Sequence, residues 1–504
     1  MLMENPLFHE LKKHLSEIKS IEAVMMLLVW DQQVYLPNGG AVARSRQLAV
    51  QAQLAHEKLT APIIGKLLDD LQSYQINLPY DSDEAGLLRV TRRLYEKAVK
   101  VPPAFKARLS AHLSKSYQVW TLARPANDFA AVQPYLEKTL SLSREYAHFF
   151  PDYALIADPL IDFKDTGMTV AAIRPFFAEL RRQLVPMIKD IREQPLPDNS
   201  CLYRTFPTAA QLSFVREVIK NIGFDFERGR QDLSPHPFES LISIGDVRMT
   251  TRVQENDLSQ TFLDTLHEMG HALYDQGLYP DFEGTPLADS ASASVTESQA
   301  RLWENVIGRS RYFWNYYYPK LQAIFQEQLN STSLETFYRA INKVQPSLIR
   351  IDADEMSYDL HVILRFDFEL QLLEGTLAVR DLPEAYRERF KADFGITPPD
   401  NRDGVLQDVH WFDGVIGGQF QSYTIGNILS VQFYEAALRE HPEILDEIAH
   451  GEFSALHNWL KEHIYRHGRK YTTMELIQRV TGKSLTIEPY IRYLRTKYGE
   501  LYNL

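Results

Sequence analysis

The sequence predicts a mainly α-helical protein with one small β-sheet. Apolar residues recur at spacings of three and four along most of the chain, which is the pattern of an amphipathic helix. Strict alternation of apolar and polar residues, the pattern of a strand, is clear over residues 247–253. No Gly/Ser-rich linker, long charge run or repeat of 20–50 residues divides the 504 residues. We therefore expect residues 1–504 to form a single domain.

The helical spacing predicts the elements in order. They span residues 7–30, 41–58, 84–97, 129–149, 170–192, 208–221, 258–276, 295–308, 334–344, 357–379, 427–439 and 473–481. The strand at 247–253 directly precedes one of these helices and carries Arg248 and Arg252 on its polar face. It could present a free edge to an extended peptide, or it could be a scaffold hairpin with its arginines in solvent.

The helix predicted over 258–276 contains the motif HEMGH at residues 267–271. His267 and His271 lie about one turn apart on the same face, so both imidazoles can bind one metal ion. Glu268 points about 100° around the helix, where it can reach a water molecule on that ion. This spacing is typical of zinc peptidases, although a solvated helix face with two ordinary histidines would look the same.

The residues around the motif favour a metal site over a solvated helix face. Apolar residues occupy much of the helix circumference, so the polar groups within it must find partners. An unpaired buried polar side chain costs about 1–3 kcal/mol, and a metal ion supplies the missing partner. Gly270 is unfavourable inside a helix, which suggests that another part of the chain approaches the backbone there.

A third ligand is expected from the helix predicted over 295–308. Glu297 follows His271 by 26 positions (297 − 271 = 26) and is the preferred candidate. Glu304 lies two turns further along and is the rival, with a supporting or surface role favoured for it. The two helices could pack side by side and bring Glu297 against the histidine pair.

The chain resembles the thermostable carboxypeptidase family, the Taq-type metallocarboxypeptidases. The resemblance rests on several motifs in family order that cover nearly the whole chain: D-x-R-x-T at 246–250, HEMGH at 267–271, I-R-x-x-A-D at 349–354, G-x-x-Q-D-x-H-W at 404–411, and the segments at 30–32 and 422–427. One departure bears on the site. Thr296 stands where the family commonly has histidine, which puts the tuning of the metal ligands in question but leaves the three ligands intact.

The resemblance implies a large helical, zincin-like metallopeptidase fold with a small antiparallel β-sheet beside a deep active-site groove. It implies one divalent metal ion, with zinc preferred and cobalt or manganese also suited to imidazole and carboxylate ligands. The ligands would be His267, His271 and Glu297, and zinc would lower the pKa of its water to about 7. Glu268 would then act as the general base. Broad side-chain specificity and a homodimer are also implied.

Further site residues come from the matching motifs. His410 and Tyr423 are candidates to stabilise the oxyanion, although each could instead be purely structural. Arg350 is the candidate clamp for the C-terminal carboxylate of the substrate, because guanidinium matches carboxylate geometry. Arg350 could alternatively pair with Asp352 or Asp354. Arg248 is the second candidate for binding the substrate.

The predicted function is hydrolysis of the C-terminal peptide bond of peptides by a metal-dependent carboxypeptidase. The alternatives are a zinc oligopeptidase that cuts internal bonds and a non-catalytic helical scaffold with a vestigial metal site. Each would show the same metal-binding motif.

The composition of the chain excludes several classes of binding partner. The net charge of −12 argues against nucleic acid, whose binding requires clustered cations. It also gives anionic substrates no general attraction, so any carboxylate must be recognised by locally placed cations. An apolar run of eight residues, 23–30, is far short of the ~20 needed to span a bilayer, so no membrane partner is expected. The single cysteine, Cys201, excludes an internal disulfide, and we expect a cytoplasmic location.

Overall fold

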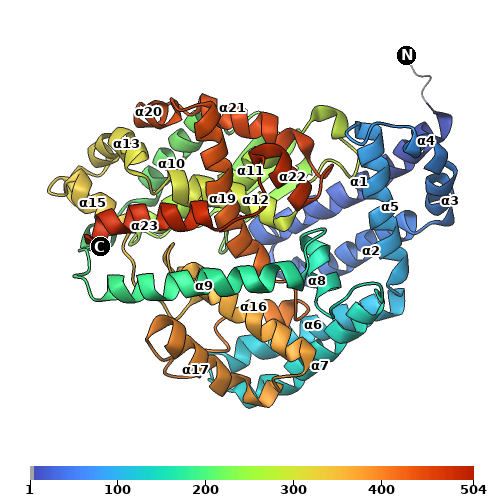
Figure 1. The fold of residues 1–504 in the computed structure, drawn as a ribbon, viewed down its shortest axis with the longest axis horizontal. Coiled ribbons are helices and arrows are strands. Elements are labelled where there is room, and N and C mark those ends of the chain that lie inside the picture. Colours follow the sequence, from blue (N-terminus) through green and yellow to red (C-terminus); the bar gives the residue numbers. More distant parts are fainter. Residues whose placement is uncertain (1–4) are drawn as a thin grey trace.

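The computed structural model describes residues 5–504, and most of them are helical (Figure 1). Each predicted helix is present. In chain order they are α1 (Pro6–Val34), α2 (Ala41–Leu59), α5 (Asp83–Lys100), α7 (Phe129–His148), α9 (Val170–Arg192), α10 (Thr208–Ile222), α11 (Leu258–Gln276), α12 (Ala293–Arg301), α15 (Leu334–Ile341), α16 (Tyr358–Glu374), α19 (Gln421–Glu440) and α22 (Thr473–Thr481). The predicted fold class, mainly helical with a small sheet, is therefore confirmed.

The structure adds helices that the periodicity did not identify. They are α3 (Pro62–Asp70), α4 (Gln72–Ile76), α6 (Pro103–Ala123), α8 (Asp158–Lys164), α13 (Arg311–Ile324), α14 (Gln326–Leu329), α17 (Leu382–Phe394), α18 (His410–Asp413), α20 (Ile444–Ala449), α21 (Ser454–His463) and α23 (Glu488–Tyr502). None of the described helices is both long and apolar enough to cross a membrane.

Two predicted helices end differently from expectation. The segment predicted to reach residue 379 stops at Glu374, because Gly375 adopts the left-handed conformation (φ 78°) that commonly terminates a helix. The segment predicted over 295–308 is α-helical only to Arg301 and continues as a π-helix over Leu302–Ile307. Such wide turns are rare and often occur near functional sites.

The sheet is mixed, which corrects the expectation of an antiparallel one. Its strands are β1 (Gly229–Leu233), β2 (Glu239–Ser243) and β3 (Asp246–Thr251), in the order β1-β3-β2. β3 pairs in parallel with β1 and antiparallel with β2. The predicted strand is therefore central and both of its edges are occupied, so the prediction that it offers an edge to a peptide is wrong. Alternating hydrophobicity shows which face is buried but carries no information about the edges.

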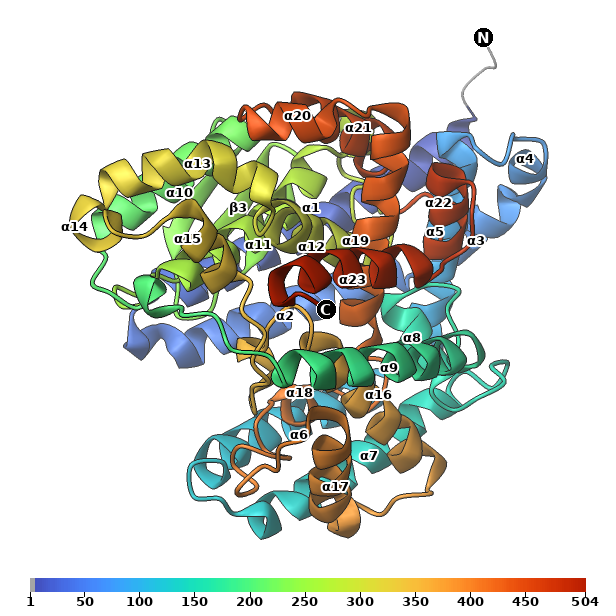
Figure 2. The ribbon, with the colours of Figure 1, turned by 60° about the vertical axis from the view of Figure 1, so that its left-hand side comes forward.

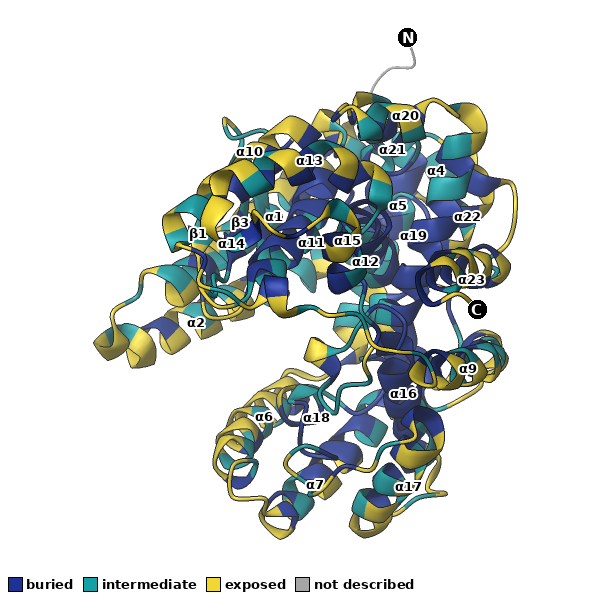
Figure 3. Ribbon diagram, turned by 90° about the vertical axis from the view of Figure 1, so that its left-hand side faces the viewer, coloured by how far each residue is buried: buried dark blue, intermediate teal, exposed yellow. Residues whose placement is uncertain are grey.

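The metal-motif helix lies in the middle of the molecule. α11 packs on β2 and β3 and also along α12, and α12 packs on α19. Figure 2 shows this group above α16 and α18, and Figure 3 shows that α11, α12, α16 and α19 are largely buried. Central helices of this kind hold side chains in fixed positions.

Two glycines let α12 approach its neighbours closely. A Cβ added to Gly270 of α11 would lie 2.5 Å from Ala300 Cα, and one added to Gly426 of α19 would lie 2.6 Å from Glu297 Cγ. Both distances are far below van der Waals contact, so α12 fits only because neither position carries a side chain. The expectation of a close backbone approach at Gly270 is confirmed.

Candidate metal centre

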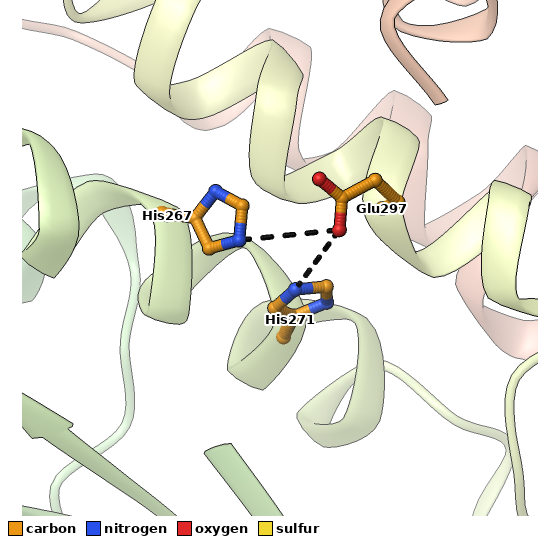
Figure 4. Close-up of side chains that lie close together, drawn as sticks. All are labelled: His267, His271 and Glu297. Atoms are coloured by element: carbon orange, nitrogen blue, oxygen red, sulfur yellow. Dashed lines mark ion pairs between the residues drawn. The ribbon is translucent and has the colours of Figure 1, made fainter. Parts of the chain in front are cut away.

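His267, His271 and Glu297 converge between α11 and α12 (Figure 4). One ligand atom from each lies within 4.8 Å of the others. Glu297 Oε2 is 4.0 Å from His267 Nε2 and 3.8 Å from His271 Nε2. The structure therefore brings together the three residues that the sequence predicted as metal ligands.

The outer nitrogen of each imidazole has its own partner. His267 Nδ1 lies 2.9 Å from Glu304 Oε2, and His271 Nδ1 lies 2.8 Å from Thr296 Oγ1. With Nδ1–H donating to these oxygens, each Nε2 faces the centre, where it offers a lone pair to a metal ion once the imidazole is neutral. Glu304 thus has the supporting role that was favoured for it. Thr296, the departure from the family pattern, orients His271 through its hydroxyl.

Arg301 holds the acidic side of the centre. Its Nε donates to Glu297 Oε1 at 2.7 Å and its Nη1 donates to Glu304 Oε2 at 3.0 Å. The guanidinium also lies over the Tyr358 ring, 4.4 Å from the ring centroid. Because Arg301 engages Oε1, the other oxygen of Glu297 remains directed at the two histidines.

The charges in the centre suit a cation. Burial opposes a charged imidazolium, yet the neighbouring carboxylates of Glu297 and Glu304 raise the pKa of His267 to about 9. Burial, together with the nearby His267, lowers the pKa of His271 to about 4. Burial acts to raise the pKa of Glu297, but Arg301 and the histidines bring it below its usual value. Two nitrogen donors and an ionised carboxylate form a donor set that fits a divalent ion such as zinc.

Glu268 is a buried carboxyl beside this centre, with 8% of its surface exposed. Burial raises its pKa to about 7, with His267 acting against the rise. It forms no hydrogen bond or ion pair with another residue in the described chain. An unengaged carboxyl with a pKa near neutrality is well suited to accept and return a proton.

Arg350 is buried next to a second cluster. Its Nε donates to Asp408 Oδ2 at 2.6 Å and its Nη1 donates to Tyr358 Oη at 2.9 Å. The alternative that Arg350 pairs with Asp352 or Asp354 is wrong, because Asp408 is its partner. Asp354 instead accepts the backbone N–H groups of Met356 and Ser357 just before α16.

His410 and Tyr423 belong to the same cluster. His410 Nδ1 lies 2.5 Å from Asp408 Oδ1, and His410 Nε2 lies 3.1 Å from Tyr423 Oη. The Arg350 guanidinium lies 5.1 Å from the Tyr423 ring centroid. Asp408 therefore joins Arg350 and His410, and Tyr358 connects the cluster to Arg301 of the metal centre.

Arg248 lies apart from this cluster. On β3 its guanidinium donates to both carboxylate oxygens of Asp246, at 2.7 and 2.8 Å, and it lies 5.8 Å from the Trp30 ring centroid. Its neighbour Arg252 differs, because Arg252 Nε is buried without a hydrogen-bond partner among residues 5–504.

The sequence analysis did not identify His236, in the turn between β1 and β2. Burial lowers its pKa, and the positive charges of Arg252, Arg350, His267 and His410 lower it further. His236 is thus within electrostatic range of both the metal centre and the Arg350 cluster. A histidine between two prolines, just before a strand, was the available signal.

A pair of buried carboxyl groups, distinct from the metal ligands, lies at the end of α11. Glu239 Oε1 is buried and has no donor in the described part of the chain, and the neighbouring group is the carboxyl of Asp275. Burial raises the pKa of both groups. Two such carboxyls form a hydrogen bond only when one of them keeps its proton.

Comparison with known proteins gives one consistent result. The model of the carboxypeptidase Taq (M32) metallopeptidase family matches residues 10–498. Thermostable carboxypeptidase 1 of Thermus thermophilus is 39% identical over 94% of this chain and 95% of its own length. Carboxypeptidase 1 of Bacillus subtilis is 33% identical over 99% and 98%.

Solved structures agree with these matches. The M32 carboxypeptidase from Deinococcus radiodurans superposes with a TM-score of 0.97 at 47% identity, covering 99% of this chain and all of that one. The Pyrococcus furiosus carboxypeptidase superposes with a TM-score of 0.94 at 31% identity, covering 99% and 100%. The chain belongs to the Taq (M32) family of metallocarboxypeptidases and is a carboxypeptidase.

Proposed function

We propose that this carboxypeptidase releases single C-terminal residues from peptides, using one divalent ion held by His267, His271 and Glu297. The proposal rests on the convergence of two imidazole Nε2 atoms and one carboxylate oxygen. The other polar atom of each of these three side chains already has a hydrogen-bond partner. Zinc is the preferred ion, and cobalt or manganese would suit the same donors.

The chemistry is divided between the ion and Glu268. When bound, the ion would polarise the scissile carbonyl and lower the pKa of a water molecule. Glu268 would accept the proton of the attacking water and then donate it to the departing amine. Its pKa near neutrality and its lack of a hydrogen-bond partner support this role.

Tyr423 and His410 are the proposed donors to the oxygen that becomes negative as the tetrahedral intermediate forms. Burial raises the pKa of Tyr423 above its usual value, so its phenol keeps the proton that it would donate. His410 is held by Asp408 and contacts Tyr423 directly, which would fix the direction of both donors.

Arg350 is the proposed clamp for the free C-terminal carboxylate. Nε and Nη1 are engaged, whereas Nη2 makes no hydrogen bond to a residue of the described chain. A guanidinium with one nitrogen open beside the metal centre can select a terminal carboxylate and so restrict cleavage to the last peptide bond. Arg248, already paired with Asp246, is the weaker candidate.

The remaining parts of the proposal are of two kinds. Broad side-chain specificity and a homodimer follow the family resemblance, whereas a single catalytic domain over residues 1–504 and a cytoplasmic location follow the composition and the absence of linkers. The substrates would be peptides, with no nucleic-acid or membrane partner.

Metal analysis and peptide digestion on one purified sample test the proposal. We expect about one zinc, cobalt or manganese ion per chain and a product ladder that shortens by one C-terminal residue at a time. Internal fragments would instead indicate an oligopeptidase. A protein with neither bound metal nor cleavage would indicate a scaffold.

A further inference from the structure

A cavity of about 970 Å³ opens beside the metal centre on the side of His271. Thr296, whose hydroxyl contacts His271 Nδ1, forms part of its wall. Side chains from α1, α2, α5, α6 and α8 form much of the rest, together with residues 290–293 and 417–419. Helices α1, α2 and α5 lie on the right-hand side of Figure 1. The cavity thus adjoins the metal centre at Thr296, and much of its wall comes from helices that hold no metal ligand.

The wall of this cavity is strongly cationic, although the chain carries a net charge of −12. Its basic members come from four parts of the chain and are Arg93 and Lys97 of α5, Lys106 of α6, Lys164 of α8, and Arg469. Among residues 5–504, Glu22 is the one acidic side chain in the wall, and Lys19 neutralises it at 2.9 Å. A local excess of cations in an acidic protein requires an explanation.

Internal ion pairs account for only part of the positive charge. Lys97 pairs with Asp162, and Arg469 pairs with Asp289 at 2.5 Å. The other three cations have no carboxylate partner among the described residues. Lys164 contacts only the amide oxygen of Gln419, at 2.9 Å, and Lys106 contacts only His56, at 3.1 Å.

Arg93 is the clearest case. Its partly buried guanidinium forms no hydrogen bond or ion pair with residues 5–504. Burial lowers the pKa of Arg93 and the neighbouring charge of Arg469 lowers it further, while the charges of Asp162 and Glu475 act in the opposite direction. A partly desolvated charge without a direct partner is unfavourable, so an anion that entered the cavity would stabilise this guanidinium.

The position of the cavity indicates which part of a substrate would reach it. The Arg350 cluster connects to the metal centre through Tyr358 and Arg301, on the side of His267 and Glu304. The cavity lies on the opposite side, at His271 and Thr296. A peptide whose C-terminal carboxylate is bound at Arg350 would therefore extend its preceding residues past the metal and into the cavity.

We propose that this cavity binds the substrate segment that precedes the scissile bond and selects acidic side chains there, with Arg93 and Lys106 as the principal cations. Apolar wall residues such as Leu94, Phe105 and Leu109 would contact the methylene groups of those side chains. This inference rests on the proposed function, and it identifies acidic peptides as the preferred substrate class.

The test compares matched peptides that share their last two residues. One carries glutamate and the other glutamine at the second, third and fourth positions before the scissile bond. We expect kcat/KM for the glutamate peptide to be at least about tenfold higher, equivalent to ~1.4 kcal/mol, with most of the difference in KM. Raising the ionic strength should reduce this preference.

Substitutions in the cavity wall test whether the cavity causes the preference for the glutamate peptide. Arg93→Gln and Lys106→Gln should each reduce it several-fold and should leave cleavage of the glutamine peptide nearly unchanged. Arg92→Gln is the matched control, because Arg92 is on the same helix but pairs with Asp69 at 3.0 Å and does not line the cavity. Thermal melting of each variant confirms that it is folded.

Equal rates for the two peptides would overturn the inference and leave the proposed function intact. The same applies if the preference survives in both cavity variants or is lost equally in Arg92→Gln. Failure to release C-terminal residues from either peptide would instead overturn the proposed function, and the inference with it.

Discussion

Replacing Arg350 should remove the selectivity of this enzyme for a free C-terminus. Only 5% of Arg350 is exposed, so a substrate carboxylate that binds it is largely desolvated. Losing a charged hydrogen bond in such a place costs about 2–5 kcal/mol. The low end of this range predicts that the wild-type enzyme cleaves a peptide amide ~30-fold more slowly than the matching free acid.

The Arg350–Asp408 pair decides how the variants must be designed. Arg350→Ala would leave Asp408 buried without its cation, and breaking a buried pair destabilises a protein by about 3–5 kcal/mol. Arg350→Lys keeps the charge but loses the planar fork, so it should recover only part of the selectivity. The double variant Arg350→Gln with Asp408→Asn removes both charges, and melting temperatures show which variants remain folded.

The assay is kcat/KM for the acid and amide forms of one peptide. We expect the acid-over-amide ratio to fall to near one in the double variant and to an intermediate value in Arg350→Lys. Arg248→Ala is the control, because Arg248 pairs with Asp246 away from the cluster. The reasoning is refuted if the Arg350 variants keep the full ratio while Arg248→Ala or Arg252→Ala abolishes it.

Three further predictions centre on residues of α11 and of the helix that packs along it. Glu268→Gln should retain the metal but lose several orders of magnitude in kcat, and activity above about a tenth of wild type, a barrier change of roughly 1.4 kcal/mol, would exclude it as the base. By metal analysis, Glu297→Ala should lose most of the bound ion. Glu304→Ala, which removes only a supporting contact, should bind it ~10–100-fold more weakly yet stay near full occupancy with excess metal; the reverse order would contradict the ligand assignment. Burial raises the pKa of Asp275 beside Glu239. The stability that Asp275 contributes is therefore greatest below the unfolded pKa of about 3.9. It is lost as the pH rises through the folded pKa, by up to ~1.4 kcal/mol per pH unit. Because burial also raises the pKa of Glu239, the double variant Glu239→Gln with Asp275→Asn should flatten this slope in melting experiments between pH 4 and 8, and an unchanged slope would show that the pair does not hold a proton.

The sequence identified those helices whose apolar residues form a clear stripe, and α11 is the best example. It did not identify α6, where Phe105, Ser116 and Ala123 are the only buried residues and no stripe exists. Strand β1 was missed for a related reason, because Gly229–Leu233 is mostly polar and is held by pairing with β3 rather than by a buried face. The periodic spacing of apolar residues arises from burial, so it does not reveal helices or strands with few buried residues.

The site was predictable where the spacing of residues within helices determines geometry. One helical turn sets His267 against His271, and the expected packing of the next helix beside them indicated Glu297. The partner of Arg350 was not predictable, because Asp408 is 58 positions away and lies in a loop. The tertiary fold alone brings such residues together.

The close packing of α12 has a consequence for how the enzyme acquires its ion. Gly270 on one side and Gly426 on the other allow α12 to touch both neighbouring helices, so Glu297 is positioned by tight contacts that do not depend on the ion. Much of the entropy of arranging the donors is therefore lost during folding rather than during metal uptake. Apo-protein prepared with a chelator should keep its fold, should regain full activity within the time of mixing, and should accept different divalent ions into one fixed geometry.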